Sequence, residues 1–270
     1  MIYQQNRRQQ SNGNDLKAVE LFFFDMDGTL YLGERIIGGA REFISKIKKN
    51  GKRTVFLSNN SSKNRKDYFS KLTKMGFECK IEDIFTSLNA TILKMKQENV
   101  KSIYPLGTKS FEEELLENGF VFSKENPDVV LLGFDKTLTY EKIDNAYQLL
   151  IKGTRYIATH PDITCPTETG YIPDIGGFIS MFEKLTSRTP EIVGKPNVGM
   201  VSSIISHFSL KPSDCAMVGD RLYTDMRMAL DASLKSILVL SGETKHDDYV
   251  KSGLDVDIEA DSVNDLIDLI

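Results

Sequence analysis

Two aspartates one residue apart, Asp25 and Asp27, end an apolar run and are followed at once by a glycine. The run, Leu21 to Phe24, has no polar alternation, which is typical of a strand buried on both faces of a parallel sheet. The carboxyl ends of such strands face the crevice in which open α/β sheets bind ligands. Two like charges this close repel unless a cation lies beside them, and a divalent metal is the obvious candidate. The pattern also occurs in calcium loops and ordinary turns, so a structural role stays open.

Three further polar clusters can take part in the same chemistry. They are Ser58, Asn59 and Asn60; Lys195 in a Gly-Lys-Pro stretch; and Asp220 with Asp225. Carboxylates, a backbone carbonyl and waters supply the near-octahedral oxygen shell that Mg²⁺ requires. A lysine adds positive charge for phosphate oxygens, and hydroxyl and amide groups add hydrogen bonds. The residue types therefore predict a cradle for a phosphoryl group.

Two of these residues have an equally simple structural interpretation. Gly-Lys-Pro by itself fits a solvated surface lysine, so Lys195 gains weight only from its place in the series of clusters. Asp225 fits an anion that stabilises a helix N-terminus.

The elements that must position these residues follow an alternating order. Short apolar runs alternate with helical patterns of three to four turns, which predicts an α/β fold with a doubly wound parallel sheet flanked by helices. The runs before the polar clusters predict strands over 21–24, 54–57, 216–218 and 236–240. Pro196 is predicted in the first turn of a helix that includes Val198, Val201, Ile204 and Ile205.

The middle third has its own apolar pattern and no polar clusters comparable with the other four. Its pattern predicts a helix from Ser87, strands over 102–106, 120–122, 129–134 and 156–159, and a helix over 140–152. A self-contained α/β segment inserted into a surface loop of the main sheet explains this best.

Composition narrows the function class. The chain has 270 residues, 40% of them hydrophobic and 27% charged, with a formal charge of −4. These values fit an ordinary globular protein and give no hint of nucleic-acid binding. No stretch approaches the roughly 20 apolar residues of a membrane span, and no secretory signal precedes the first strand. Three scattered cysteines without a Cys-x-x-Cys pair suggest reduced thiols. We therefore expect a cytoplasmic protein without a membrane partner, acting on a small metabolite as a monomer or homodimer.

The four clusters, taken in order, resemble the motifs of the haloacid dehalogenase superfamily of phosphohydrolases. Residues 25–31 look like its first motif, 58–60 its second, Lys195 its third and 219–225 its fourth. Tyr31 and the Gly-Asp-Arg-Leu-x-Thr-Asp form resemble the NagD-like and p-nitrophenyl phosphatase branch, which carries a large α/β cap. The resemblance implies a Rossmann-like core over 19–86 and 187–270 and an inserted cap over 87–186. The N-terminus is rich in Gln, Asn, Arg and Ser, and we expect residues 1–18 to be a disordered lead-in.

The resemblance also implies roles for single residues. Asp25 becomes the nucleophile and a Mg²⁺ ligand, and Asp27 the general acid/base and a ligand through its carbonyl. Asp220 becomes the third protein ligand, and Asp225 supports metal-bound water or Lys195 from outside the ligand shell. Ser58, Asn59, Asn60 and Lys195 would hold the phosphate, and residues 30–39 would form a flap hairpin beside the site.

A loop at the edge of the cap that faces the core would reach the leaving group in such an enzyme, and residues 159–162 and 170–177 resemble the matching segments. His160 and Asp162 are therefore candidate substrate contacts, although a loop histidine bonded to backbone fits His160 equally well.

The expected function is Mg²⁺-dependent hydrolysis of phosphomonoesters through an aspartyl-phosphate. Candidate substrates are nucleotides, sugar phosphates, glycerol phosphate and p-nitrophenyl phosphate. A phosphotransferase usually has a small cap after the first motif, a haloacid dehalogenase would lack the second aspartate, and a cation pump would need membrane helices. The alternative from another class is a protein that binds Mg²⁺ and a phosphorylated ligand without turning it over.

Overall fold

The computed structural model describes residues 16–167 and 169–270, which divide by their contacts into two compact units. The first comprises the described part of residues 1–56 together with 75–78 and 201–270, and the second comprises 57–74 and 79–200. Most of the expected lead-in over 1–18 lies outside the described residues. The functional boundaries at 19–86, 87–186 and 187–270 are a different division and remain a prediction.

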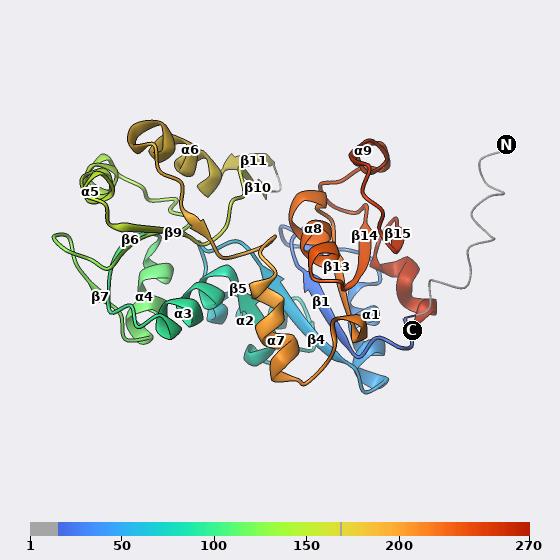
Figure 1. Ribbon diagram of the computed structural model, residues 1–270. Helices are drawn as coiled ribbons and strands as arrows, with labels where there is room; N and C mark the ends of the chain where they lie inside the picture. The colour runs from blue at the N-terminus through green and yellow to red at the C-terminus, as the bar shows by residue number, and fades with distance from the viewer. Residues whose placement is uncertain (1–15, 168) are drawn as a thin grey trace. The chain divides into compact units, whose positions relative to one another are not determined.

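The first unit is built on a sheet whose strands lie in the order β15-β14-β13-β1-β4 (Figure 1). Pairings of β1 with β13, of β13 with β14 and of β14 with β15 are parallel. Its strands are β1 (Leu21–Asp25), β2 (Tyr31–Leu32), β3 (Arg35–Ile36), β4 (Arg53–Ser58), β13 (Cys215–Gly219), β14 (Lys235–Val239) and β15 (Ile258–Ala260). Its helices are α1 (Ala40–Lys49), α7 (Gly199–His207), α8 (Arg227–Asp231) and α9 (His246–Ser252). The last residues of β4 and the first residues of α7 belong to the second unit.

A cluster of aromatic rings fixes β1 in the first unit. Phe22 and Phe24 stack with ring centroids 6.2 Å apart, and the ring of Phe43 on α1 lies edge-on to both. Phe56 on β4 approaches Phe24 at 6.3 Å. All are fully buried, and each buried phenylalanine contributes about 1.5–3 kcal/mol of transfer free energy. The carboxyl end of β1 is therefore anchored by packing before any polar interaction acts on it.

The short hairpin expected over residues 30–39 is present. Strands β2 and β3 pair antiparallel, with Tyr31 opposite Ile36 and Leu32 opposite Arg35. The two residues between them, Gly33 and Glu34, make the turn, and Gly33 has a positive φ of 61°. A two-residue hairpin loop favours such a residue because its twist then matches that of the strands.

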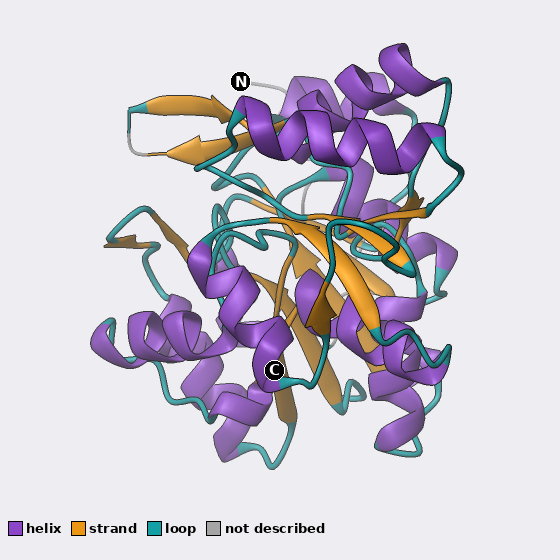
Figure 2. Cartoon of the chain, turned by 90° about the vertical axis from the view of Figure 1, so that its left-hand side faces the viewer, coloured by secondary structure: helices purple, strands orange, loops and turns teal. Residues whose placement is uncertain are grey.

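The second unit has its own parallel sheet, in the order β12-β9-β8-β6-β7. Strands and helices alternate along the chain in this unit. Figure 2 draws the strands in orange and the helices in purple. Its strands are β5 (Ile84–Thr86), β6 (Ser102–Leu106), β7 (Val121–Phe122), β8 (Val129–Leu132), β9 (Arg155–Ala158), β10 (Thr164–Thr167), β11 (Gly170–Pro173) and β12 (Glu191–Ile192). Its helices are α2 (Arg65–Lys74), α3 (Ser87–Gln97), α4 (Lys109–Glu117), α5 (Tyr140–Ile151) and α6 (Ile175–Thr186).

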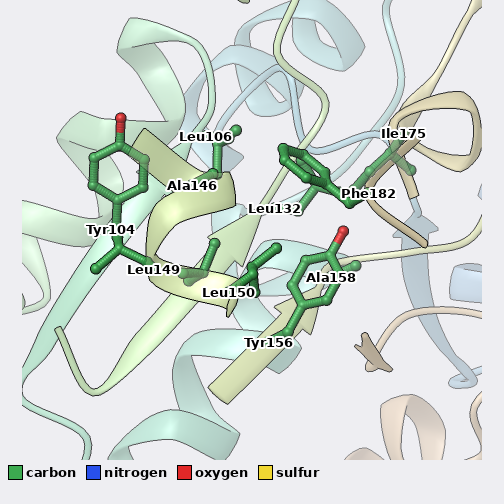
Figure 3. Packing of buried hydrophobic residues seen from close by; sticks show 11 residues of the cluster. Tyr104, Leu106, Leu132, Ala146, Leu149, Leu150, Tyr156, Ala158, Ile175 and Phe182 are labelled. Carbon is green, nitrogen blue, oxygen red and sulfur yellow. The ribbon is translucent and has the colours of Figure 1, made fainter. Parts of the chain in front are cut away.

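Helices α5 and α6 share one hydrophobic cluster with this sheet (Figure 3). Leu149 and Leu150 of α5 pack there with Leu132 of β8. The rings of Tyr156 on β9 and Phe182 on α6 meet edge to face, 6.1 Å between centroids. The prediction of an α/β fold is confirmed, and the two parallel sheets account for it.

One sequence expectation about local structure is wrong. Pro196 does not lie in the first turn of a helix, because α7 begins three residues later, at Gly199. Instead the Lys195–Pro196 peptide bond is cis, and Asn197 donates its backbone N–H to the carbonyl of Gly194 at 2.9 Å. The side-chain Oδ1 of Asn197 accepts from the backbone N–H of Gly199 at 2.8 Å, so an asparagine turn precedes the helix.

Two further expectations can be compared with the structure. Cys79, Cys165 and Cys215 form no disulfide, and burial raises the pKa of the Cys215 thiol to about 11. Among the helices of residues 16–167 and 169–270, none combines the length and apolar character needed to cross a membrane.

Glu114 on α4 leads to a prediction about pH and stability. Its carboxyl is buried, Oε1 accepts from Asn89 Nδ2 at 2.6 Å, and burial raises its pKa above the usual value despite this bond. A raised carboxyl pKa in the native state means that an ionised Glu114 destabilises the fold at high pH, and that this cost disappears as pH falls through the native pKa. We expect Glu114→Gln, which keeps the acceptor for Asn89, to raise Tm at pH 8 by about 2–4 °C, and by less at pH 5.

The measurement is thermal unfolding by circular dichroism across this pH range, with the exposed Glu113→Gln on the same helix as the control. A Tm gain that is independent of pH, or that is shared by the control, would contradict the explanation.

Candidate active site

Strand β1 and the turn that follows it position Asp25 in the first unit. Asp25 is the last residue of the strand and 9% exposed. The chain then turns around the carbonyl of Met26, which accepts from the backbone N–H groups of Thr29, Leu30 and Tyr31 at 3.3, 2.9 and 3.3 Å. Gly28 has φ +93°, a left-handed conformation that only glycine adopts readily. The turn therefore requires a glycine directly after the aspartate pair.

Asp220 is held at the end of β13 by contacts on both carboxylate oxygens. Oδ1 accepts from the hydroxyl of Thr29 at 3.4 Å, and Oδ2 accepts from the backbone N–H of Glu243 at 2.6 Å. Its side chain is 1% exposed. A Cβ at Gly28 or at Gly242 would collide with this carboxylate. Gly242, which lies after the end of β14, therefore leaves the space that the Asp220 carboxylate occupies.

Asp225 lies in a π-helical segment, Leu222–Met226, that follows β13. It is fully buried, and Oδ2 accepts from the backbone N–H of Arg221 at 3.2 Å. A Cβ at Gly219 would collide with its side chain. Single π-helical turns occur often at functional sites. The bond to Arg221 also gives Asp225 the role at a helix start that the sequence had left open.

These three aspartates form a group that can hold a cation. One carboxylate oxygen from each of Asp25, Asp220 and Asp225 lies within 4.8 Å of those of the other two. Three buried carboxylates this close repel one another, and a divalent cation relieves that repulsion. An all-oxygen donor set suits a hard cation such as Mg²⁺ better than a transition metal that prefers nitrogen or sulfur. The donor chemistry therefore fits the magnesium expected from the sequence.

Asp27 differs from Asp25 in its surroundings. Its side chain is half-buried, and Oδ2 accepts from the hydroxyl of Tyr31 at 3.4 Å. The two aspartates, which look alike in the sequence, therefore have different surroundings. Tyr31, a residue of the first motif, has Asp27 of the same motif as its hydrogen-bond partner.

The residues of the second cluster lie in the second unit, where most of their side-chain groups already have partners. Ser58 donates its hydroxyl to Tyr68 Oη at 3.1 Å and accepts from the backbone N–H of Asn60 at 3.2 Å. Asn60 Oδ1 accepts from the backbone N–H and the hydroxyl of Ser62 at 2.9 and 2.8 Å, and Nδ2 donates to Cys165 Sγ at 3.4 Å. The polar residues after β4 therefore stabilise their own turn by hydrogen bonds to one another.

Lys195 is buried and tied to Asn59. It is 2% exposed, so the interpretation as a solvated surface lysine is wrong. Asn59 Oδ1 accepts from its backbone N–H at 2.9 Å, and Asn59 Nδ2 donates to its carbonyl at 3.0 Å. The second and third motifs are thus joined directly within the second unit.

The second unit also contains a buried polar cluster, two members of which, His160 and Asp162, were expected as substrate contacts. His160 is fully buried, with Nδ1 3.7 Å from Asp162 Oδ2 and Nε2 3.8 Å from Asp174 Oδ1. The proximity of both to Asp174 in this cluster was not predicted. Its members come from two segments twelve residues apart, and their order in the chain does not show that they meet.

The structure thus brings the predicted residues together in two sets. Asp25, Asp220 and Asp225 form one set, and Asn59, Lys195 and Asp162 form the other. The expected convergence of both sets at one sheet edge remains a prediction.

Comparisons with known proteins agree with these motifs. Residues 22–121 match the model of haloacid dehalogenase-like hydrolases, and residues 192–266 match a second, HAD-hydrolase-like model. An acid sugar phosphatase of Staphylococcus haemolyticus is 33% identical over 86% of this chain and 89% of its own. The chain belongs to the haloacid dehalogenase-like hydrolases.

Solved structures extend the similarity to the fold. A 4-nitrophenylphosphatase of Thermotoga maritima has a TM-score of 0.90 at 42% identity, covering 94% of this chain and 98% of that one. A glycerol phosphate phosphatase of Mycobacterium tuberculosis, solved in complex with magnesium, has a TM-score of 0.80 at 25% identity, covering 88% and 73%. The predicted superfamily, its NagD-like and p-nitrophenyl phosphatase branch, the core fold and the phosphatase class are confirmed.

The crowding around Asp220 leads to a second prediction. We expect Gly242→Ala to lower kcat/KM at least about 10-fold, because the added methyl group displaces the Asp220 carboxylate while the backbone needs no change of conformation. The readout is phosphatase activity together with the circular dichroism spectrum of the folded variant.

Gly177→Ala serves as the matched control, because a Cβ there meets nothing within 4 Å. Activity of Gly242→Ala equal to that of this control would show that the position of Asp220 does not matter.

Proposed function

We propose that this phosphatase is Mg²⁺-dependent and hydrolyses small phosphomonoesters through an aspartyl-phosphate on Asp25. The observation that carries the proposal is the group of Asp25, Asp220 and Asp225, whose buried carboxylate oxygens lie within 4.8 Å of one another. The magnesium bound to the glycerol phosphate phosphatase of related fold supports the choice of ion.

The chemistry assigned to Asp25 and Asp27 follows from two displacements at phosphorus. A carboxylate oxygen of Asp25 forms a bond to phosphorus while the ester P–O bond breaks, and Asp27 gives its proton to the leaving oxygen. Asp27 then takes a proton from water, whose oxygen attacks the aspartyl-phosphate and releases inorganic phosphate and Asp25. A bound Mg²⁺, held by Asp25, Asp220 and the carbonyl of Asp27, would supply positive charge for the transferring phosphoryl group.

We assign phosphate binding to Lys195 and to the run Ser58–Asn60. Lys195 would provide the positive charge and Ser58 a hydroxyl. Since the side chain of Asn59 already has partners, this residue would act through its backbone N–H group. The backbone N–H of Asn60 donates to Ser58 Oγ at 3.2 Å, so Asn60 would have to exchange that bond for one to phosphate. Asp225 lies beside Asp25 and Asp220, and from there it would hold the groups around the metal in position.

The substrate is proposed as a small phosphorylated metabolite. The related enzymes are named for acid sugar phosphates, 4-nitrophenyl phosphate and glycerol phosphate, and no single substrate is common to these names. A cytoplasmic location, a monomer or homodimer, and substrate contacts by His160 and Asp162 also remain predictions. The non-catalytic alternative is a protein of this fold that binds Mg²⁺ and a phosphorylated ligand only.

The central prediction concerns the nucleophile. Asp25→Asn keeps the size of the side chain but removes the attacking carboxylate, so we expect hydrolysis of p-nitrophenyl phosphate to fall by about 10³-fold or more. Chelation of divalent metal should abolish wild-type activity, and added Mg²⁺ should restore it. Turnover that survives both treatments would refute the mechanism, whereas ligand binding without any wild-type turnover would favour the non-catalytic alternative.

A separate prediction distinguishes Asp27 from Asp25. Asp27→Asn cannot protonate the leaving oxygen, which matters most when that oxygen is strongly basic. We therefore expect the variant to lose at least about 10-fold more activity with an alkyl phosphate such as glycerol phosphate than with p-nitrophenyl phosphate. Equal losses on both substrates would remove Asp27 from the role of general acid.

A further inference from the structure

Asn59 has a side-chain amide whose two hydrogens are both engaged. Nδ2 donates one hydrogen to the carbonyl of Lys195 and the other to Asp162 Oδ1, both at 3.0 Å. Oδ1 accepts from the backbone N–H of Lys195 at 2.9 Å. An amide NH₂ group has only two hydrogens, so none remains for a phosphate oxygen.

We propose that Asn59 is a positioning residue for Lys195, and that Asp162 is a positioning residue for Asn59. The proposal rests on the function assigned to Lys195 above. The side chain of Asn59 then supports the backbone of Lys195 and leaves phosphate binding to the backbone N–H of Asn59, and Asp162 supports Asn59 in place of the substrate contact expected for it.

Fixing the backbone at Lys195 decides where its ammonium group can reach. The ammonium group lies at the end of a four-carbon stem, so even a small rotation of the peptide plane displaces the charge. Asn59 bonds both the N–H and the carbonyl of this one residue, which fixes the peptide planes on either side of its Cα. Aspartate at position 59 would lack the donor for the carbonyl, and alanine would lack both groups.

Asn59 is itself held in place by its neighbours. The hydroxyl of Ser87, the first residue of α3, donates to the Asn59 carbonyl at 2.5 Å. Gly194 donates its N–H to the carbonyl of Thr159 at 2.7 Å, and a Cβ at Gly194 would lie 2.7 Å from Asn59 Oδ1 and 2.8 Å from the Cβ of Ser87. The glycine of the Gly-Lys-Pro stretch therefore leaves the space that the amide occupies.

Asp162 connects this support to the start of α6. Its second carboxylate oxygen lies 3.7 Å from His160 Nδ1, and His160 Nε2 lies 3.8 Å from Asp174. Asp174 caps α6 by accepting from the N–H of Ile175 at 2.6 Å, and the carbonyl of Asp162 accepts from the N–H of Gly176 at 2.8 Å. Asp162 and His160 are 4% and 0% exposed, which suits a supporting role.

The test is a double-mutant cycle between position 59 and position 195, read as kcat/KM for p-nitrophenyl phosphate. Asn59→Ala should lower kcat/KM by about 10–100-fold, because it leaves buried partners of the backbone and of Asp162 unsatisfied. In a Lys195→Ala background the same substitution should cost less than about 3-fold, because there is no ammonium group left to position. Asn126→Ala, an exposed asparagine of the same unit, is the control.

The outcomes separate the two proposals. If Lys195→Ala retains wild-type activity, the phosphate-binding role of Lys195 fails. If Lys195→Ala is impaired and the Asn59→Ala loss is the same in both backgrounds, Asn59 acts independently of the lysine and the positioning role fails.

A second pair of variants tests the support if Asn59→Ala does not fold. Asp162→Asn keeps an oxygen that can accept from Asn59 Nδ2, so its activity should stay within about 3-fold of wild type. Asp162→Ala removes that oxygen and should lower kcat/KM by about 10-fold or more, and this loss should also disappear in the Lys195→Ala background. Equal losses in Asp162→Asn and Asp162→Ala, or a loss that persists without the lysine, would overturn the proposal.

Discussion

Repulsion among three buried carboxylates is the constraint on which the first unit depends. Asp25, Asp220 and Asp225 come from three different segments, and one buried carboxylate oxygen of each lies within 4.8 Å of those of the other two. Apolar packing must bring them there, because the charges themselves resist the approach. The stacked rings of Phe22 and Phe24 and the parallel pairing of β1 with β13 supply that force. The hydrophobic core thus imposes this geometry, and a bound cation would relieve the repulsion.

Much of this arrangement could be predicted from the sequence because it depends on local patterns. The run Leu21–Phe24 and the run Ala216–Val218 are apolar without alternation, so both were recognisable as buried parallel strands, and the aspartates that follow them fell at strand ends. The hairpin of β2 and β3 was expected from the family resemblance, and its Gly33 provides the turn. Local preference and tertiary structure agree at these places.

What could not be predicted depends on contacts between residues far apart in the chain. Asn59 and Lys195 are separated by 136 positions, and nothing in either motif indicates that the amide binds the backbone of the other. His160 and Asp162 were expected as substrate contacts, but their proximity to Asp174 was missed for the same reason. The strands β10 and β11 lack an apolar pattern because their residues are only partly buried or exposed. The π-helical turn at Leu222–Met226 has no composition of its own.

The contacts of Asn59 with Lys195 involve only backbone atoms of the lysine. Any residue other than proline presents the same N–H and carbonyl, so the support does not depend on which side chain position 195 carries. The placement of a charge and the nature of that charge are therefore encoded by different residues. A substitution of the lysine side chain therefore removes the charge and leaves the bonds to its backbone in place, whereas a substitution of Asn59 removes these bonds and leaves the charge in place.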